Sequence, residues 1–400
     1  MTDIKDVAGA VPDTGAEAGP EAKDPPLTVL YVVNEATFFL SHRLRLACEA
    51  RNCGFRVVIV CGEQTGESQL AEHGFEYRTI PLSRSSFNPL RELRTYLALE
   101  QIYRAEQPDL VHHVTIKPVI YGTRIARRMQ VAAVVNAIPG LGFVFTRTGK
   151  WAWLRRRLVS AMYRSALRHP NMRLILQNRE DLDAFIANMH VAPSQTCLIR
   201  GAGVDLEEFS FGPEPEAPMS FILVARMLAD KGVRQFVEAA RSVKARKPSW
   251  RFTLLGGVDP GNLASLSAAE LESWDAEGVV HWAGHRTDVV DCMRDHHIVC
   301  LPTYYREGLP KSLLEAAAIG RAMIASDIPG CRDIVRDGVT GLAVAPRDAP
   351  ALAAAMVRLG EDGALRERLR NAARSRAEEI FSVEDVVHDT FLVYEELLGA

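Results

Sequence analysis

The sequence predicts an α/β protein built from two doubly wound domains that face each other across a cleft. After residue 26, short apolar runs rich in β-branched residues alternate with longer amphipathic stretches, a pattern typical of parallel strands connected by helices. Twelve such runs are too many for one comfortable sheet, and the 400-residue chain is long enough for two domains. The pattern also restarts midway, which divides the strands between two sheets.

The elements follow one another in a regular order. Residues 1–26 are rich in Ala, Gly, Pro, Asp and Glu, so we expect a disordered tail that buries too little apolar surface to fold. The strands expected in the first half are 28–34, 56–61, 76–80, 109–114, 131–136 and 172–176. Those expected in the second half are 219–225, 251–256, 279–282, 297–301, 322–326 and 341–344. Helical patterns lie between them, for example at 44–51, 90–106, 232–245 and 312–320.

The segment 203–215, which contains several Gly, Pro and Glu residues, marks the predicted linker. We therefore expect a first domain over 27–206 and a second over 207–382. The last helix, 383–398, is expected to cross back onto the first domain. Open α/β sheets bind ligands at the carboxyl ends of their strands, so motifs that follow strands in both halves should meet in the cleft.

Charge is distributed unevenly along the chain. The net charge of −3 gives no reason to expect a nucleic-acid partner. Residues 110–179, however, contain 13 Lys and Arg and no Asp or Glu, so the other 330 residues carry −16. A basic front half joined to an acidic back half suggests one face that meets an anionic surface.

The sequence also indicates a compartment. Seven cysteines without a C-x-x-C pair are expected to be reduced, mostly buried thiols of a cytosolic protein. We expect no secretory signal, because the N-terminus has no apolar core segment. No apolar run reaches the roughly 18 residues that a spanning helix needs, so we predict that the chain does not span a membrane.

The most informative motif is a pair of glutamates, Glu307 and Glu315, eight positions apart. Between them, Gly308 and Pro310 are expected to open a helix whose free backbone amides can hold phosphate oxygens. Carboxylates accept hydrogen bonds from sugar hydroxyls. A phosphate seat between two hydroxyl-binding groups matches a nucleotide-sugar, although glutamates at this spacing can also be ordinary solvated charge on a helix.

A second motif stands at the start of the second half. Arg226 ends a predicted strand, and Lys231 begins the helix that follows. Two cations at the carboxyl end of a strand suit a diphosphate leaving group, where negative charge builds as a glycosidic bond breaks. The alternative is a pair of solvated surface cations.

Together these residues resemble the retaining glycosyltransferases of family 4, which have the two-domain GT-B fold. Arg226 and Lys231 match that family's R-x4-K diphosphate clamp, and Glu307 and Glu315 match its E-x7-E motif. The resemblance implies that Glu307 faces the donor sugar and Glu315 the ribose. It also places the backbone of Gly308, Leu309, Pro310 and Lys311 near the phosphates, and a nucleotide base beside Gly256, Gly257, Gly284, His285 and Arg286. The first loop, 34–37, departs from the family by lacking a Gly-Gly pair.

Further segments resemble a bacterial subgroup that builds capsule, exopolysaccharide and O-antigen or glycan repeat units on a polyprenyl diphosphate; they are 38–43, 115–122, 140–146, 177–181 and 327–333. This resemblance implies an N-terminal acceptor-binding domain and a C-terminal nucleotide-sugar-binding domain, both Rossmann-like. It further implies a UDP-activated hexose or N-acetylhexosamine as donor and a polyprenyl-diphosphate-linked sugar as acceptor. The expected mechanism is front-face displacement without a protein nucleophile, and no cofactor is expected beyond the nucleotide-sugar co-substrate.

Four other side chains are candidates. His112 and His113 end a predicted strand where the family often places a cleft histidine, so one of them is expected to contact donor or acceptor; the alternative is that one is buried and the other solvated. His42 and Arg43 follow the first strand, near the expected acceptor face. No metal is implied, because the Asp-Leu-Asp sequence at 181–183 is interpreted as a helix start.

The acid-free span also suggests a membrane surface. It contains tryptophans among arginines, a combination that suits a bilayer interface: Trp151, Trp153, Arg155, Arg156 and Arg157. The alternative is an exposed basic helix whose tryptophans pack inward. We therefore expect a cytoplasmic protein held peripherally at the inner face of the cell membrane.

Three other functions fit the sequence less well. A soluble family 4 transferase making a small glycoside would have no need of the basic patch. A non-catalytic nucleotide-sugar-binding protein should have lost part of the clamp, whereas all four of its charged residues are present. A dinucleotide-dependent dehydrogenase should have a G-x-G-x-x-G turn after the first strand, and residues 33–36 contain none.

Overall fold

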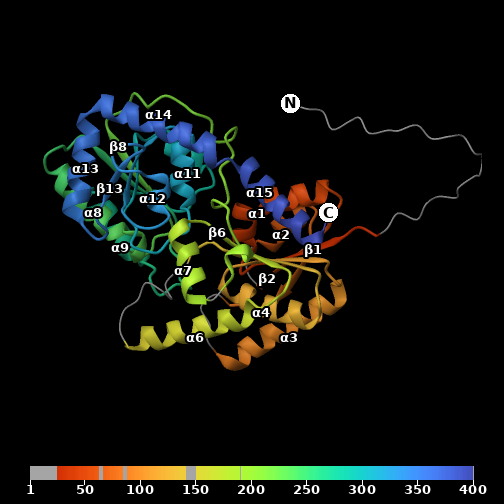
Figure 1. The fold of residues 1–400 in the computed structure, drawn as a ribbon. Coiled ribbons are helices and arrows are strands. Elements are labelled where there is room, and N and C mark those ends of the chain that lie inside the picture. Colours follow the sequence, from red (N-terminus) through yellow and green to blue (C-terminus); the bar gives the residue numbers. More distant parts are fainter. Residues whose placement is uncertain (1–24, 63–65, 84–87, 141–149, 190, 400) are drawn as a thin grey trace, which may run out of the picture.

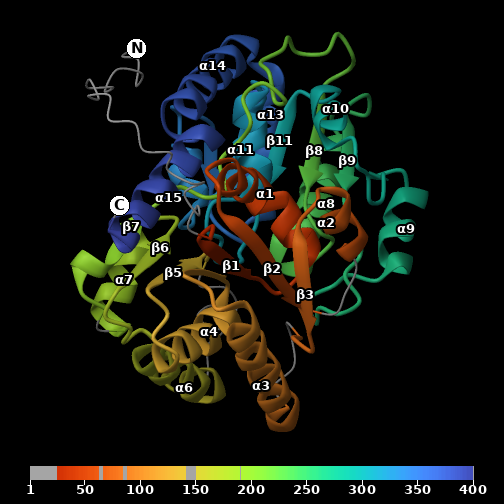
Figure 2. The ribbon, with the colours of Figure 1, turned by 90° about the vertical axis from the view of Figure 1, so that its right-hand side faces the viewer.

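The computed structural model describes residues 25–62, 66–83, 88–140, 150–189 and 191–399. The predicted disordered tail lies almost wholly outside the described residues. Two parallel sheets, each flanked by helices, form the two halves of the molecule (Figures 1 and 2). The first has the strand order β3-β2-β1-β4-β5-β6-β7 and the second β10-β9-β8-β11-β12-β13. The prediction of two doubly wound parallel sheets is confirmed.

The first half alternates strands and helices from the N-terminus. Its strands are β1 (Thr28–Val32), β2 (Arg56–Gly62), β3 (Glu76–Ile80), β4 (Leu110–Val114), β5 (Ala133–Ile138), β6 (Met172–Leu176) and β7 (Thr196–Leu198). Its helices are α1 (Ala36–Asn52), α2 (Glu67–Glu72), α3 (Pro89–Glu106), α4 (Ile116–Arg128), α6 (Lys150–Ala166) and α7 (Arg179–Met189), with a short 3-10 turn, η1 (Pro193–Gln195).

The second half repeats the arrangement. Its strands are β8 (Ser220–Val224), β9 (Arg251–Leu255), β10 (His281–Trp282), β11 (Ile298–Leu301), β12 (Ala322–Ser326) and β13 (Leu342–Val344). Its helices are η2 (Ala229–Lys231), α8 (Val233–Lys244), α9 (Ala268–Ala276), α10 (Val289–Arg294), α11 (Lys311–Ala318), α12 (Cys331–Ile334), α13 (Ala349–Glu361) and α14 (Gly363–Ile380). The chain ends with α15 (Val383–Leu398).

The central strands are buried on both faces, which explains why they appear in the sequence as continuous apolar runs. All five residues of β1 and all four of β11 are buried. Apolar clusters fill the space between each sheet and its two helical layers. This burial supplies the main driving force for folding and holds the strand ends in fixed positions.

Pairing within the second sheet determines which loops come together. β8 pairs with β11 in parallel, with Phe221 opposite Ile298 and Ile222 opposite Val299. Parallel neighbours end at the same edge, so the loop after β8 and the loop after β11 lie next to each other. Those loops carry Lys231 and Glu307.

The last helix, α15, packs against the first sheet rather than the second. Val386, Val393 and Leu397 belong to the same core cluster as Val29 of β1. The Tyr394 hydroxyl lies 2.6 Å from His112 Nδ1 and donates a hydrogen bond of 3.1 Å to the Tyr31 hydroxyl. The chain therefore ends against the half in which it began (Figure 1).

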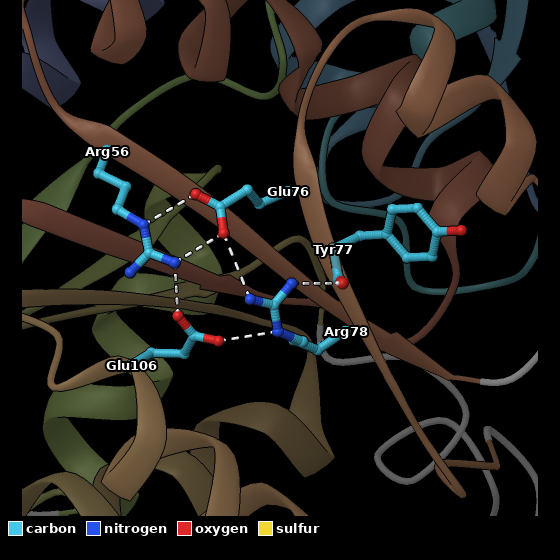
Figure 3. A network of polar contacts seen from close by, with 5 residues as sticks. All are labelled: Arg56, Glu76, Tyr77, Arg78 and Glu106. Atoms are coloured by element: carbon cyan, nitrogen blue, oxygen red, sulfur yellow. Dashed lines mark hydrogen bonds and ion pairs between the residues drawn. The ribbon is translucent and has the colours of Figure 1, made fainter.

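An ionic network at the edge of the first sheet joins β2, β3 and the end of α3 (Figure 3). Arg56 donates to both carboxylate oxygens of Glu76, at 2.8 and 2.6 Å, and to Glu106 at 2.7 Å. Arg78 donates to the other Glu106 oxygen at 2.8 Å. The carboxylate at the end of α3 is thereby used to anchor the helix to the sheet.

Two elements differ from the predicted ones. α1 begins at Ala36, eight residues before the predicted helix, because its N-cap residue is Glu35, which forms no capping hydrogen bond and gives no start signal in the sequence. The strand β7 was not predicted. It has only three residues, all half-buried, and forms an edge strand beside β6.

Candidate active site

Lys231 and Glu307 form an ion pair at the edge where the second sheet faces the first half. Both side chains are largely buried, and Thr303 donates a hydrogen bond of 3.2 Å to the same glutamate oxygen. The ring of Tyr305 lies 5.7 Å from the Lys231 ammonium. The two motifs found in the sequence, 76 positions apart, therefore meet.

The loop that carries Lys231 is fixed by the backbone of Asp230. Its carbonyl oxygen accepts hydrogen bonds from the amides of Tyr304 and Tyr305, at 2.9 and 3.1 Å, and from the Thr303 hydroxyl at 3.0 Å. Burial raises the pKa of the Asp230 carboxyl, while the nearby Lys231 opposes that shift. The two motif loops thus form one hydrogen-bonded unit.

Arg226 is paired with a different carboxylate, Asp259, which follows β9. Its guanidinium is about half exposed, and Asp259 is held in turn by an amide hydrogen bond of 2.9 Å to Ser265. The cations of the predicted clamp therefore have one carboxylate partner each. An exposed ion pair of this kind is worth little energy, so Arg226 can exchange its partner at small cost.

Glu315 lies in the second turn of α11 and is buried. Burial raises the pKa of its carboxyl, and the ammonium of Lys311, 3.1 Å away, opposes the shift. Pro310 is the residue before the helix rather than its first residue, and its carbonyl accepts from the amides of Leu313 and Leu314. The first two amides of the helix, those of Lys311 and Ser312, have no carbonyl of their own helix to bind.

The loop that carries Glu307 lies against the first half. The Leu309 amide donates a hydrogen bond of 3.0 Å to the side-chain oxygen of Gln177, which follows β6. A Cβ added at Gly308 would lie 1.7 Å from the Pro139 carbonyl oxygen, so only glycine fits there. The Leu309 amide, predicted as part of the phosphate seat, is thus already bonded to Gln177.

Ion pairs reinforce this contact. Arg306 lies 2.9 Å from Asp181, whose side chain is almost fully buried in the first turn of α7. Arg332 pairs with Glu180 across the same boundary and with Asp327 of its own half at 2.6 Å. Asp181 therefore begins a helix, as the sequence suggested, and in addition binds the loop next to Glu307. We call the contact region between the halves the junction.

His42 of α1 faces the junction. Burial, then the neighbouring Arg43 and the ammonium groups of Lys311 and Lys231 from the other half, lower its pKa to about 3. Its ring stacks on Phe38 with centroids 4.2 Å apart, and its Nδ1 lies 2.7 Å from the Ser41 hydroxyl. At neutral pH His42 is therefore an uncharged hydrogen-bonding group close to the clamp lysine.

The residues expected beside a nucleotide base also lie together. Gly256 donates from its amide to the Gly284 carbonyl at 2.8 Å, and the Met227 amide donates to the Gly257 carbonyl at 2.9 Å. A Cβ added at Gly257 would lie 3.4 Å from the Cβ of His285. Arg286 is exposed and pairs with Asp288 at 2.8 Å. This turn therefore adjoins the loop of Arg226.

Buried polar atoms without a partner are few among the described residues, and several lie at the strand ends that carry the motifs. They include Asn34 Oδ1 after β1, Thr115 Oγ1 after β4 and Asp230 Oδ1 after β8.

Comparison with known families agrees with this geometry. Residues 28–178 match the model described as glycosyl transferase 4-like, and residues 218–362 match the model described as glycosyl transferases group 1. Between them the two models span most of both sheets. The chain belongs to the group 1, family 4-like glycosyltransferases.

Curated relatives cover most of this glycosyltransferase. A Campylobacter jejuni protein named N,N'-diacetylbacillosaminyl-diphospho-undecaprenol alpha-1,3-N-acetylgalactosaminyltransferase is 27% identical over 332 residues, covering 80% of this chain and 85% of its own. An Escherichia coli protein named UDP-Gal:alpha-D-GlcNAc-diphosphoundecaprenol alpha-1,3-galactosyltransferase is 23% identical over 333 residues, with coverages of 79% and 83%.

Solved structures share the fold. A glycosyltransferase from Rickettsia africae superimposes with a TM-score of 0.73 at 17% identity, covering 93% of this chain and 99% of its own. The Anabaena protein HepE, solved with UDP-glucose, gives a TM-score of 0.73 at 17% identity, with coverages of 94% and 100%. The GT-B fold expected from the sequence is confirmed.

The two adjacent histidines of this glycosyltransferase are both buried inside β4, and the expectation that one of them contacts donor or acceptor stays a prediction. β4 continues to Val114, so both residues are inside the strand and point to opposite faces. His112 is buried against Tyr31, with ring centroids 5.4 Å apart. His113 is buried on the other face, with its Nδ1 2.7 Å from Asn136 Oδ1, and burial lowers its pKa to about 4.

Arg43 lies on the buried side of α1, and burial lowers the pKa of its guanidinium. Its guanidinium donates to the His42 carbonyl at 3.1 Å, and its electrostatic neighbours are Tyr31 and Tyr394. In a helix with about 3.6 residues per turn, adjacent side chains point in directions about 100° apart, so only one of His42 and Arg43 can face the junction. A contact between Arg43 and the acceptor stays a prediction.

The predicted membrane residues lie on α6. Trp151, Trp153, Arg155 and Arg156 belong to that helix, and their side chains fall outside the described residues; Arg157 is exposed. Within the described ranges, the structure contains no helix that combines the length and hydrophobicity needed to span a bilayer.

Asp259 and Thr303 were missed in the sequence, and Gln177 was named only as part of the segment 177–181, without a role of its own. Asp259 and Gln177 each follow a strand, so the strand-end rule could have identified them as candidates. Thr303 follows β11 in the same way. Asp259 lies 33 positions from its partner Arg226, and Gln177 lies 132 positions from Leu309. Thr303 bonds to Glu307, 4 positions away, and to Asp230, 73 positions away. Contacts over such long separations carry no local sequence signal.

Proposed function

We propose that this enzyme is a retaining glycosyltransferase that moves a hexose or N-acetylhexosamine from a UDP-sugar to a sugar on a polyprenyl diphosphate. The observation that carries the proposal is the meeting of Lys231 and Glu307 beside Arg226, within a chain whose family is established. This arrangement places cations for a diphosphate next to a carboxylate for sugar hydroxyls.

The donor assignment is supported by two names. The Escherichia coli relative is named for UDP-Gal, and HepE was solved with UDP-glucose. The acceptor assignment is supported by the names of the two relatives, both of which contain a diphosphate-linked undecaprenol. A lipid-linked acceptor in turn favours a protein associated peripherally with the inner face of the cell membrane.

In the proposed reaction, the acceptor hydroxyl attacks the anomeric carbon from the side on which the diphosphate leaves. The new carbon–oxygen bond forms as the bond to UDP breaks, and the acceptor proton passes to the departing phosphate. Lys231 and Arg226 turn from Glu307 and Asp259 toward the phosphate charge that develops. Glu307 is then free to accept hydrogen bonds from the donor sugar, and the first amides of α11 support the phosphates.

The remaining residues position the substrates. Glu315 is expected to accept from the ribose hydroxyls, and the turn with Gly256, His285 and Arg286 is expected to border the base. Neutral His42, close to Lys231 and Lys311, can bond to the acceptor or donor sugar. Holding the reactants in this way lowers the entropic part of the barrier.

The test is UDP release from a panel of UDP-sugars, with and without a polyprenyl-diphosphate-linked sugar. We expect release above background only when donor and acceptor are both present, with retention of anomeric configuration in the product. Lys231→Ala and Arg226→Ala should each lower kcat roughly 100- to 1,000-fold, because one charged donor to the leaving group is lost.

Arg241→Ala provides the matched control. Arg241 is an exposed arginine on α8 of the same half, and it pairs with Glu277 at 2.6 Å. Its replacement by alanine should leave kcat unchanged. Turnover close to that of the wild type in either clamp variant, or equal losses in all three variants, would remove the clamp from the mechanism.

A further inference from the structure

The outer face of α3 exposes a row of leucines. Leu90 is 71% exposed, Leu93 54% and Leu97 48%, although large apolar side chains are usually buried. Their spacing of three and four residues places them on one side of the helix. The opposite side carries Thr95, Leu99 and Tyr103 into the core.

Each carboxylate of α3 is paired with a cation, including Glu100, which lies three residues beyond Leu97 on the leucine side. Glu92 pairs with Lys117 at 2.7 Å and accepts from the Tyr121 hydroxyl at 2.7 Å, both on α4. Glu100 is buried and pairs with Arg104 at 2.7 Å. Glu106 is held in the network of Figure 3. The three acids of the helix are thus ion-paired, whereas Arg91 and Arg94 beside the leucines are exposed.

The surroundings of α3 extend this basic, apolar surface. α4 contacts both α3 and α6, and in Figures 1 and 2 the helices α3 and α6 form the end of the first half farthest from the second sheet. Leu158 of α6 is 62% exposed, and the arginines exposed on α4 and α6 include Arg127, Arg128 and Arg157. Residues 110–179, which include α4 and α6, have no acidic residue.

We propose that Leu90, Leu93 and Leu97, flanked by Arg91 and Arg94, dock α3 flat on an anionic lipid bilayer. A helix with leucines on one face and arginines beside them binds at the level of the lipid headgroups, where the apolar side chains enter the acyl boundary. The arginines add attraction to anionic headgroups. A second copy docked through the same face would bring these arginines against their own counterparts, so the charge favours lipid over self-association.

The position of α3 suits an enzyme whose acceptor is lipid-linked, and in this respect the inference rests on the proposed function. α3 follows β3, and α4 follows β4, so the first turns of both helices lie at the carboxyl edge of the first sheet. Lys117 at the start of α4 reaches Glu92 near the start of α3. The leucine row therefore begins at the edge of the sheet that faces the predicted acceptor site.

The test is co-sedimentation of the full chain with vesicles of phosphatidylethanolamine and phosphatidylglycerol, compared with vesicles of phosphatidylcholine alone. We expect binding to the anionic vesicles that weakens with salt. Replacing the three leucines together by serine should weaken it at least about tenfold, since apolar burial is lost. Arg91→Glu with Arg94→Glu should weaken it by roughly fivefold or more for each arginine.

Two controls lie in the other half. Leu263→Ser removes a leucine that is 95% exposed, and Arg368→Glu reverses an exposed arginine of α14; neither should change vesicle binding. Equal binding by the α3 variants and the wild type would overturn the proposal. The proposal would also be overturned if the wild type bound no vesicles but self-associated on size-exclusion chromatography, and the α3 variants lost that self-association. That result would identify a second copy as the occupant.

The outcome is separable from that of the proposed function. Vesicle sedimentation uses neither donor nor acceptor, so an inactive protein that binds anionic vesicles through α3 would sustain this inference alone. Conversely, UDP release with a detergent-dispersed acceptor, unchanged in the leucine variant, would sustain the proposed function even if no vesicle binding occurred.

Discussion

At the scale of single residues, the predicted clamp contains two ion pairs of different character. Lys231 and Glu307 are mostly shielded from water, whereas Arg226 beside Asp259 is about half exposed. A shielded pair is screened little by salt and holds both groups in one geometry. A diphosphate brings more negative charge than one carboxylate, so it can compete for both cations.

His42 gives a prediction in pH. Its pKa of about 3 in the folded protein lies below the roughly 6.5 of an unperturbed histidine. Between these values the unfolded chain binds a proton that the folded protein does not, so stability is complete above about pH 6.5 and falls as pH decreases toward 3. His42→Gln removes this proton linkage. Between pH 7 and pH 5, the wild type should lose about 1 to 2 kcal/mol more than the variant in urea unfolding.

Titration of the same histidine should not contribute to the pH dependence of kcat/KM. Because it stays neutral from pH 6 upward, the pH dependence of kcat/KM should have no limb that disappears in His42→Gln. The other histidines with lowered pKa values, such as His113 and His169, remain in both proteins and cancel in the comparison. Equal losses of unfolding free energy between pH 7 and pH 5 in the two proteins would contradict the neutral state of His42.

At the scale of elements, α15 is fixed to the first sheet by a buried polar contact. Tyr394→Phe would leave His112 Nδ1 and the Tyr31 hydroxyl without this partner in a site closed to water. Unpaired buried groups cost roughly 1–3 kcal/mol, so we expect the free energy of unfolding of the first half to fall by that amount. The measurement is a lower urea midpoint. Leu392→Ala, at an exposed position of the same helix, should change stability by less than about 0.5 kcal/mol. Equal midpoints for Tyr394→Phe and the wild type would show that the contact contributes nothing.

The elements also show how much of the fold the sequence alone predicts. Long apolar runs give the buried strands directly, since a central parallel strand such as β11 is apolar on both faces. Boundaries are less certain where the signal is weak. α1 starts without a side-chain cap, so its first turn carries no sequence signal, whereas β4 ends at Val114, where the sequence predicts it. That His112 and His113 are both buried inside this strand depends on packing that periodicity does not show. Tertiary partners such as Asp259 for Arg226 depend on strand order, which periodicity does not encode.

At the scale of the whole molecule, the two halves meet through ion pairs of unequal burial. Asp181 is almost fully buried where Arg306 contacts it, while Glu180 and Arg332 are each about half exposed. Removing one partner of a buried pair leaves an uncompensated charge, whereas an exposed pair contributes little. The junction should therefore depend on Arg306 far more than on Arg332, although both arginines cross it.

Arg306→Ala tests this directly, because the residue precedes Glu307 and its loss frees the loop that carries the glutamate. We expect kcat to fall roughly tenfold or more, since small displacements of a positioning group are costly. Arg332→Ala is the matched control and should change kcat little. In a double-mutant cycle on unfolding, Arg306→Ala with Asp181→Asn should give a coupling of about 0.5–3 kcal/mol, and Arg332→Ala with Glu180→Gln a coupling below about 1 kcal/mol. Equal couplings for the two pairs would mean that burial does not decide which contact holds the halves together. The position of Glu307 would then be determined within its own half, by its contacts with Lys231 and Thr303.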